Sequence, residues 1–418
     1  MLEAKKKRAL IIDPLVSAPY LAESIKRSDI EIIALYTRAD QLSERERKIR
    51  ICPELFTQTI YFSPASEKLE ELAKQIRALD VDFIFSGCES SIPLTDQLLQ
   101  LLDMPYKNNP TTSLARCDKY HMQEALKRVG LPSIAQMIIA SRTLLPQQIS
   151  ELKEWPFPLL AKPRDGAGSA GVKTVHSLAE LQTHLKNAPT RALSTEINDF
   201  VLQELLVGDE YFVDTFSALG QHAIVSVQRY RKTDFQGHAI YRYCEIVDPQ
   251  SCEYKIASEY VISVLNAVEL ANGFAHTELF LTATGPRLIE VNPRISGALG
   301  FPNKMAEKTV GISQPQALTE FLTNGSLNLA ERQLTAYGRV VFLQNWHPRV
   351  IGELNVAKLR ELPSYVEHRT LHPSGTVLGM PSSLPDTVAY VLLVNPDQGQ
   401  LIKDYEQLKY WEEHDELF

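Results

Sequence analysis

The fold is decided by the stretch His276-Thr-Glu-Leu-Phe-Leu-Thr-Ala-Thr-Gly-Pro-Arg-Leu-Ile-Glu-Val-Asn-Pro-Arg294, which carries two carboxylates, an amide and a terminal arginine. Polar and apolar residues alternate over 277–281, and 287–291 is a second strand-like run, so the stretch predicts a β-hairpin. Residues 283–285, Ala-Thr-Gly, suit a three-residue turn with the glycine in the left-handed conformation.

Two carboxylates face each other across this predicted hairpin. The turn places Glu278 directly opposite Glu290, and strand alternation puts Asn292 on the same face. Facing carboxylates repel each other at neutral pH unless a cation lies between them. An all-oxygen set with an amide suits Mg²⁺ that is shared with phosphate oxygens, so we predict metal binding by these three side chains. The alternative is a surface hairpin with scattered charges.

A glycine-rich stretch lies upstream, between Phe157 and Val172. Its glycines match the dinucleotide-binding G-x-G-x-x-G pattern, but a β-branched strand follows where that pattern requires a helix. A loop between two strands instead predicts a flap, whose backbone N–H groups close over a triphosphate while Lys162 supplies positive charge. A purely structural hairpin is the alternative. The flap residues assigned to the triphosphate are Gly166, Gly168, Ser169 and Gly171.

Length and composition set the class of protein. The chain has 418 residues, 44% hydrophobic and 22% charged, which is enough for two or three domains. A net charge of −8 argues against nucleic acid as a partner, because phosphate neutralisation requires a basic face. No apolar stretch approaches the roughly 18 residues that span a bilayer, and the N-terminus lacks a signal-peptide core, so we expect a cytoplasmic protein with no membrane partner. The five cysteines form no C-x-x-C pair, which indicates neither zinc nor a disulfide framework.

Short apolar runs alternate with helical patterns at the start of the chain, which predicts a Rossmann-like open parallel sheet. Its first strand ends in Asp13-Pro14 rather than in a glycine loop, so we expect this sheet to face a substrate rather than a nucleotide. The predicted domains are 1–112, the Rossmann-like domain; 113–200, a linking helix and a lid with the glycine flap; 201–330, a β-rich catalytic subdomain; and 331–418, a small β-rich C-terminal extension.

Four motifs occur in a recognisable order. Lys119 lies within Cys117–Met122, Lys162 precedes the glycine flap, Gln203–Tyr211 follows, and Glu290–Arg294 completes the series. The ordered set resembles the ATP-grasp superfamily of carboxylate–amine ligases over about residues 1–330. The resemblance implies an α/β fold, α+β in its ATP-binding half, in which a Rossmann-like domain precedes an ATP-grasp fold and a small β-rich C-terminal domain.

Three further segments, Gly208–Ser217, Tyr241–Glu245 and His276–Glu278, look like the branch of L-amino acid ligases that make dipeptides. Many superfamily members carry glutamate where this chain has Gln203, so backbone contacts from that segment are expected to matter more than its first side chain.

The resemblance implies a nucleotide site. The backbone of Gln203 and Glu204 would bond the adenine edge, Leu206 would pack on the ring, and Glu210 would accept the ribose hydroxyls. Lys119 and Lys162 would neutralise phosphate oxygens. The implied cofactors are ATP and two Mg²⁺ ions at Glu278, Glu290 and Asn292, with Mn²⁺ as the alternative ion.

The implied reaction is phosphoryl transfer from ATP to a small-molecule carboxylate, giving an acyl phosphate that a small-molecule amine attacks. Arg294 and Lys162 are the expected catalytic residues, because Arg294 has a fork that suits the substrate carboxylate and the tetrahedral intermediate. The small-residue loop at Ser296 and Gly297 would seat the substrate, and Glu245 would accept the ammonium of an amino acid. A homodimer is left open.

Two other functions remain at this point. One is a carboxylase-type or purine-biosynthesis-type ATP-grasp enzyme, although the biotinyl A-M-K-M string is absent from the chain. The other is a nucleotide-binding module without turnover, against which the intact set of Glu278, Glu290, Asn292 and Arg294 argues.

Overall fold

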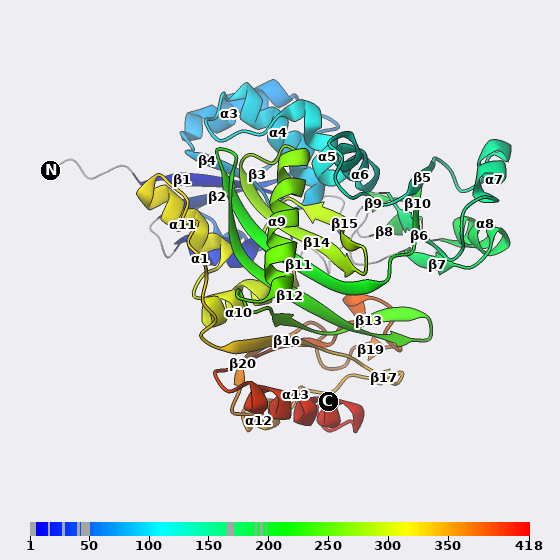
Figure 1. Ribbon diagram of the computed structural model, residues 1–418. Coiled ribbons are helices and arrows are strands. Elements are labelled where there is room, and N and C mark those ends of the chain that lie inside the picture. The colour runs from blue at the N-terminus through cyan, green and yellow to red at the C-terminus, as the bar shows by residue number, and fades with distance from the viewer. Residues whose placement is uncertain are drawn as a thin grey trace.

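The computed structural model describes residues 6–15, 17–26, 30–39, 42, 51–164, 171–188, 190–192, 195–197 and 199–418. Three sheets organise the molecule: an N-terminal parallel sheet, a lid sheet that projects to one side, and a long central sheet (Figure 1). This mixed α/β architecture confirms the predicted fold class. No helix among the described residues is long and apolar enough to cross a membrane.

The N-terminal sheet is parallel throughout, in the strand order β3-β2-β1-β4, as the alternation of strands and helices predicted. Leu10 and Ile12 pack with helices on one face, and Ile11 packs with a helix on the other, so the strands are apolar on both sides. The elements are β1 (Arg8–Ile12), α1 (Ala18–Lys26), β2 (Glu31–Tyr36), η2 (Pro53–Leu55), β3 (Gln58–Tyr61), α3 (Leu69–Leu79), β4 (Phe83–Ser86), η3 (Glu89–Ser91) and α4 (Ile92–Leu101).

A linking segment leads to the lid. Asp118 caps the helix that carries Lys119, because its side chain accepts a hydrogen bond from the backbone N–H of His121. The lid sheet has the order β5-β10-β6-β7, and two helices complete its core. The elements are η4 (Pro110–Thr112), α5 (Ser113–Cys117), α6 (Lys119–Arg128), β5 (Gln136–Ile139), α7 (Pro146–Leu152), β6 (Leu159–Pro163), β7 (Lys173–Val175), α8 (Leu178–Asn187), β8 (Arg191–Ala192), β9 (Thr195–Glu196) and β10 (Phe200–Glu204).

The central sheet has eight strands in the order β15-β14-β11-β12-β13-β16-β20-β18. Tyr211 packs under helix α9 on one face, whereas its neighbour Phe212 packs with helix α10 on the other. The elements are β11 (Gly208–Ala218), β12 (Gln221–Phe235), β13 (His238–Ile246), α9 (Cys252–Ala267), β14 (Gly273–Thr282), β15 (Gly285–Asn292), η5 (Ala298–Gly300), α10 (Phe301–Val310) and α11 (Gln314–Asn324).

The C-terminal strands extend this same sheet. Strand β16 pairs with β13, and β20 pairs with β16, so the expected C-terminal domain is β-rich but shares its main sheet with the preceding subdomain. The elements are β16 (Tyr337–Leu343), β17 (Arg349–Val350), α12 (Val356–Leu359), β18 (Tyr365–Thr370), β19 (Val377–Leu378), η6 (Leu384–Asp386), β20 (Ala389–Asn395) and α13 (Gln398–Glu413).

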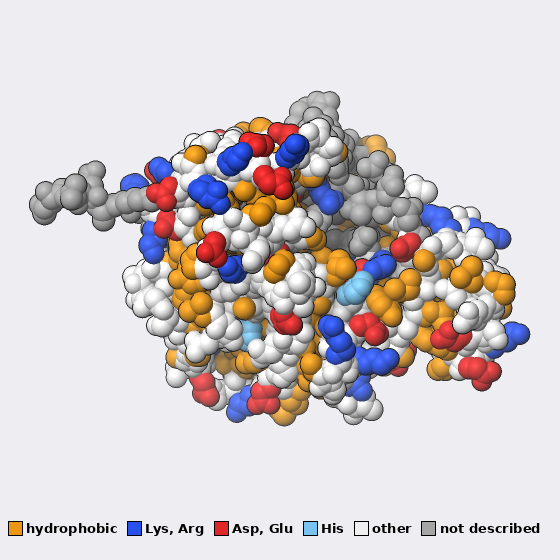
Figure 2. Space-filling view, turned by 90° about the horizontal axis from the view of Figure 1, so that it is seen from above, with side chains coloured by type: hydrophobic (Ala, Val, Ile, Leu, Met, Phe, Trp, Pro, Cys, Tyr) orange, Lys and Arg blue, Asp and Glu red, His pale blue; other side chains and the backbone are white. Residues whose placement is uncertain are grey.

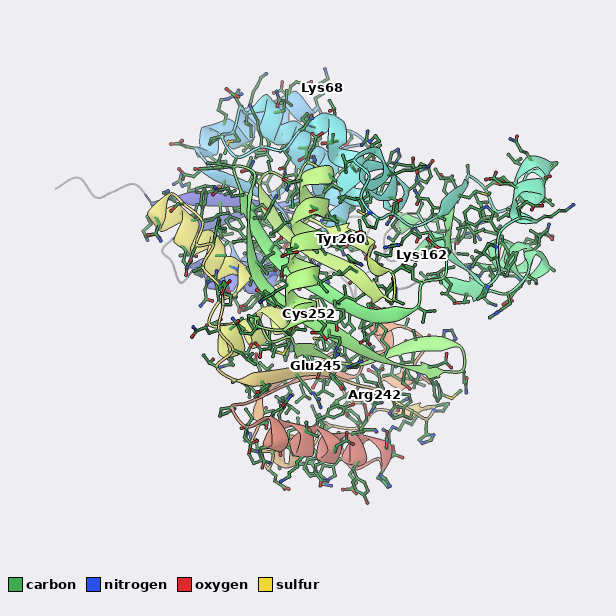
Figure 3. All side chains as sticks on the ribbon, in the orientation of Figure 1. Lys68, Lys162, Arg242, Glu245, Cys252 and Tyr260 are labelled. Carbon is green, nitrogen blue, oxygen red and sulfur yellow. The ribbon has the colours of Figure 1, made fainter. Side chains whose placement is uncertain are left out.

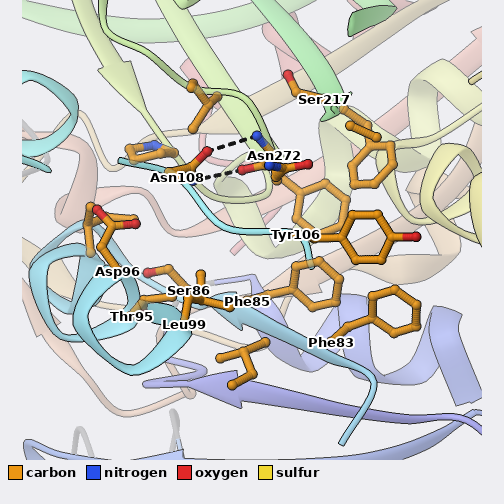
Figure 4. Close-up of a pocket in the computed structure, with 18 of the residues that line it drawn as sticks. Phe83, Phe85, Ser86, Thr95, Asp96, Leu99, Tyr106, Asn108, Ser217 and Asn272 are labelled. Atoms are coloured by element: carbon orange, nitrogen blue, oxygen red, sulfur yellow. Dashed lines mark hydrogen bonds between the residues drawn. The ribbon is translucent and has the colours of Figure 1, made fainter. Parts of the chain in front are cut away.

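Aromatic rings join the N-terminal sheet to the central sheet. Phe85 of β4 lies 5.4 Å from Phe274 of β14, and Tyr106 lies 5.4 Å from Phe321 of α11, measured between ring centroids. These rings line a cavity of about 50 Å³, beside which Asn108 and Asn272 exchange hydrogen bonds (Figure 4). This packing fixes the carboxyl end of β4 against β14 and α11.

Candidate active site

The hairpin that decides the fold is formed by β14 and β15. Glu278 lies directly opposite Glu290, as the sequence predicted. The route to this register differs, because Thr282 pairs with Gly285 across a two-residue turn instead of a three-residue one. A bulge after Glu278 leaves Ile289 of β15 without a partner residue on β14. This extra residue shifts the pairing by one position, so Glu278 still lies opposite Glu290, as the predicted three-residue turn would have placed it. Gly285 does take a positive φ, of 102°.

Cations surround the facing carboxylates. Lys119, the first residue of α6, places its Nζ 3.1 Å from Glu290, and the Nδ2 of Asn292 donates to Glu290 Oε1 at 3.2 Å. Burial alone would raise the pKa of Glu290, but the ammonium groups of Lys119 and Lys162 outweigh it and lower that pKa to about 2. Glu290 is therefore held ionised.

Lys162 comes from the lid. It lies on β6, at the junction between the lid and the central sheet (Figure 3). Burial and the neighbouring charge of Lys119 lower its pKa to about 8, against the attraction of Glu290. The structure therefore brings together residues from three separate motifs: Lys119, Lys162 and the carboxylate pair.

His276 is a site residue that the sequence reasoning quoted but did not assign. Its Nδ1 lies 2.8 Å from Asp214 Oδ1, and its Nε2 lies 3.2 Å from Glu278 Oε1. Burial would lower the pKa of this imidazole, but the two carboxylates raise it to about 9. The alternation in His276-Thr-Glu278 puts both side chains on one face, whereas the pairing with Asp214 depends on a strand far away in sequence.

Glu210 also faces this cluster, and it has a partner. Lys232 Nζ donates to both carboxylate oxygens of Glu210 at 2.7 Å, and lies 4.1 Å from the centre of the Tyr241 ring. Burial raises the pKa of Glu210 despite this ammonium. Any ribose hydroxyl bound by Glu210 must therefore share it with Lys232.

The lid and the central sheet are joined by the segment between β10 and β11. Gln203 and Glu204 end β10, and Leu206 lies half-buried before β11 begins. The Gln203 amide is buried against Gln136, at 3.4 Å. Glu204 donates its backbone N–H to Ala135 and accepts from the Ala135 N–H with its side chain, so this part of the link is held in place.

Arg294 is buried and already paired. Its Nε donates to Glu89 Oε1 at 2.6 Å, and its NH1 donates to the carbonyl oxygen of Ile295 at 2.8 Å. Glu89 follows β4, so this ion pair joins the N-terminal sheet to the end of the β14–β15 hairpin. The sequence reasoning missed Glu89, since nothing in the local pattern relates it to Arg294.

The loop after Arg294 differs from the expected substrate seat. Ser296 is fully buried; its hydroxyl accepts from Asn303 and its backbone N–H donates to Gln314, so its side chain is not available to a ligand. Gly297 remains partly accessible, with open space beside its Cα. Ala298 and Leu299 adopt positive φ values of 49° and 52°, which is sparsely populated backbone beside the arginine.

Glu245 is not brought to this site. It stands opposite Arg229 on β12, which stands opposite Tyr211 on β11, whereas Glu278 stands opposite Phe212. Adjacent residues of a strand point to opposite faces, so Glu245 lies on the reverse side of the sheet from Glu278 and Glu290. Its prediction as the ammonium acceptor beside Arg294 is corrected accordingly.

Of the flap, only part can be placed. Gly166, Gly168 and Ser169 lie outside the described residues. Gly171 follows them with a φ of 74°, and its carbonyl oxygen lies 3.1 Å from Nε2 of His184.

The carboxylate pair is the candidate metal site. The described part of the chain contains no group of three His, Cys, Asp or Glu side chains placed to hold a metal ion. Glu278, Glu290 and Asn292 supply two carboxylates and an amide, a set that fits an ion taking its remaining ligands from water and phosphate, as Mg²⁺ does. The side chains of Glu278 and Glu290 are 16% and 20% exposed, so they can be reached.

Comparison with known proteins agrees with this geometry. A family model described as an ATP-grasp domain matches residues 155–302. The chain contains an ATP-grasp domain. The match covers the lid from residue 155 onward and the β14–β15 hairpin, and it confirms the resemblance seen in the ordered motifs.

Relatives and solved structures extend this finding. Dapdiamide A synthase of Enterobacter agglomerans is 28% identical over 63% of this chain and 62% of its own length. The L-arginine-specific L-amino acid ligase of Bacillus subtilis is 26% identical over 48% of each chain. The chain thus matches about half to three fifths of the length of these two relatives.

Two solved structures share nearly the whole fold. The L-amino acid ligase of Bacillus licheniformis superposes with a TM-score of 0.76 at 17% identity, covering 97% of this chain and 98% of its own. The N5-carboxyaminoimidazole ribonucleotide synthetase of Thermotoga maritima gives 0.68 at 18% identity, with the same coverage of both chains. At these identities the likeness concerns the fold.

Proposed function

We propose that this protein is an ATP-dependent ligase that joins a carboxylate to an amine and releases ADP and phosphate. The observation that supports this most strongly is the convergence of Lys119, Lys162, Glu278 and Glu290 at the junction of the lid and the central sheet, within an ATP-grasp domain. Phosphoryl transfer depends mainly on positioning and charge stabilisation, which this arrangement provides.

The chemistry requires an activated carboxylate. A free carboxylate is a poor acyl donor, because its leaving group would be oxide. One carboxylate oxygen attacks the γ-phosphorus of ATP, ADP leaves, and an acyl phosphate forms. The amine nitrogen then attacks the acyl carbon, the C–O bond to phosphate breaks, and the amine loses a proton to give the amide.

Each residue has a role in this proposal. Glu278, Glu290 and Asn292 would hold Mg²⁺, which supplies positive charge beside the transferred phosphoryl group. Lys162 would neutralise a nonbridging phosphate oxygen. Lys119, which pairs with Glu290, would exchange that carboxylate for phosphate.

The nucleotide base and ribose are assigned to the link and its neighbour. Leu206 is half-buried where the link passes between the two sheets, and it would pack on the adenine ring beside the backbone of Gln203 and Glu204. Glu210 would accept the ribose hydroxyls together with its partner Lys232. The flap glycines Gly166, Gly168 and Gly171, with Ser169, would close over the phosphates and exclude water.

The acyl substrate is proposed to be an L-amino acid. The similarity to dapdiamide A synthase and to an L-amino acid ligase supports this class. Arg294 would bind the carboxylate and stabilise the tetrahedral intermediate. With Glu245 on the reverse face, Glu89 is the acidic group adjacent to Arg294, and it would accept the amino acid's ammonium.

The function is tested by ADP release against a panel of amino acids supplied singly and in pairs, with and without bicarbonate. Turnover that requires an amino acid and a second amine supports the ligase. Turnover that requires bicarbonate supports a carboxylase-type enzyme, and nucleotide binding without ADP release under any condition supports a binding module.

A further inference from the structure

A second pocket lies on the reverse face of the central sheet. It has a volume of about 220 Å³ and is bounded by β12, β13 and β16, by the amino end of α9 and by α13. Tyr211 and Glu245 line it, and both belong to the face opposite the catalytic carboxylates. Figure 3 shows Glu245 near Cys252, where α9 begins, and away from Lys162. The pocket is therefore separate from the proposed active site.

A row of charged side chains forms one wall. Arg229, Glu245 and Arg339 stand directly opposite one another on three neighbouring strands. Arg229 NH2 donates to Glu245 Oε1 at 2.6 Å, and Arg339 NH2 donates to Glu245 Oε2 at 3.2 Å. One carboxylate thus receives two guanidinium groups, and this row carries an excess positive charge.

Arg339 packs against two aromatic rings, and one of its N–H donors has no hydrogen-bond partner among the described residues. Its guanidinium carbon lies 4.4 Å from the Tyr243 ring centre and 4.9 Å from the Tyr405 ring centre, so the cation packs against both rings, which also contact each other edge to face. The Arg339 side chain is 12% exposed, and its Nε is buried without a hydrogen-bond partner among the described residues. A guanidinium has five N–H donors, and a buried donor without an acceptor is unfavourable.

Exposed carboxylates also line the pocket. Asp248 and Glu253 line it as exposed residues, one in the loop after β13 and one in the first turn of α9. With Glu245 they give three carboxylates against the two arginines that line the pocket. A phosphate dianion would face this net negative charge. A molecule with a carboxylate at one end and an ammonium at the other can instead pair its carboxylate with an arginine and its ammonium with the carboxylates of the pocket.

We propose that this pocket binds a small zwitterion, a free amino acid or a dipeptide, with its carboxylate on Arg339 and its ammonium toward Asp248 and Glu253. Leu401 and Ile402 of α13 also line the pocket and would contact the ligand's carbon atoms. The site is additional to the proposed catalytic site and does not depend on its activity.

The test is isothermal titration without nucleotide, using L-leucine and L-alanyl-L-alanine as probes, with isocaproate as the des-amino and L-leucinamide as the des-carboxylate control. Arg339→Met should weaken binding of at least one probe by about tenfold or more, because it removes the charge-assisted hydrogen bonds. Ile402→Trp should do the same by filling the pocket; Ile402 is 42% exposed, so the fold should tolerate the change. Both control compounds should bind far more weakly than leucine.

Two matched variants locate the binding. Arg349→Met removes another arginine that pairs with a carboxylate and stacks on a ring, outside the pocket, and should bind the probes as the parent does. Arg294→Met should also retain the binding measured without nucleotide. The proposal is overturned if the parent binds neither probe below about 10 mM, if Ile402→Trp binds both as the parent does, if isocaproate binds as well as leucine, or if Arg294→Met alone abolishes binding. These outcomes are independent of ADP formation, which tests the catalytic proposal.

Discussion

Glu290 and Glu245 are carboxylates of the same sheet, both surrounded by cations, and they differ in which cations these are. Glu290 faces the lysines Lys119 and Lys162, one of which comes from the lid. Glu245 faces arginines from neighbouring strands of its own sheet. Lysine is a compact point charge on a flexible stem, whereas arginine binds carboxylates in a fixed fork. The proposed function requires the first face to exchange its cations for a metal and phosphate, whereas the second face holds its carboxylate in place.

The largest expected effect separates these two carboxylates. Glu290→Gln should lower ADP formation by at least about 10²-fold with the fold retained, because it removes a charge at the transferred phosphoryl group. Glu245→Gln should stay within about threefold of the parent, since it lies on the reverse face. Steady-state kinetics at saturating Mg²⁺ and circular dichroism measure both. A Glu290→Gln enzyme as active as Glu245→Gln would refute the metal assignment.

The pH dependence of activity tests the role of the charge on Lys162. Its pKa of about 8 means that the ammonium is lost as pH rises through 8, so kcat/KM for ATP should fall above that value. Lys162→Arg should move this alkaline limb to higher pH, because guanidinium stays protonated, while lowering the maximum by about 10-fold or more. A parent profile that stays flat to pH 9.5 would contradict the role of the Lys162 charge.

The pH dependence of stability tests the ion pairs of His276. Its pKa is raised from 6.5 to about 9, so its contribution to folding is fully present below pH 6.5 and is lost as pH rises through 9. The free energy of unfolding of the parent should exceed that of His276→Gln most at pH 6.5, and the gap should narrow by about 3 kcal/mol toward pH 9.5. Urea unfolding at both pH values measures this. A gap that does not change with pH would show that the imidazole is not held charged between Asp214 and Glu278.

The smallest effect concerns the loop after Arg294. Ser296→Ala removes the hydroxyl that accepts from buried Asn303, which should cost about 1 to 2 kcal/mol of stability and leave the KM for the amino acid within about twofold. Thermal unfolding measures the loss of stability, and steady-state kinetics measure the KM for the amino acid. A large rise in that KM without loss of stability would restore Ser296 to the substrate site.

Local patterns predicted much of this molecule. Strand periodicity gave the parallel N-terminal sheet and the opposition of Glu278 and Glu290, because both follow from alternation within short segments. A one-residue bulge replaced the predicted turn without changing the outcome.

Pairing between segments that are distant in the chain could not be predicted from the sequence. The face on which Glu245 lies depends on the register of β13 against β12 and β16, and nothing within Tyr241–Glu245 specifies it. The pairs Asp214 with His276 and Glu89 with Arg294 likewise join segments 62 and 205 residues apart. The extension of the central sheet by β16, β18 and β20 has the same origin, since strand order is a tertiary property.

The most direct test of the central claim replaces the amine with hydroxylamine in the presence of ATP, Mg²⁺ and the amino acid that supports ADP release. An acyl phosphate predicts the amino acid hydroxamate in equal amount with ADP and phosphate. The same assay with Glu290→Gln should give hydroxamate reduced in step with ADP. Formation of AMP and pyrophosphate, or ADP release without hydroxamate, would contradict a ligase that activates its substrate through an acyl phosphate.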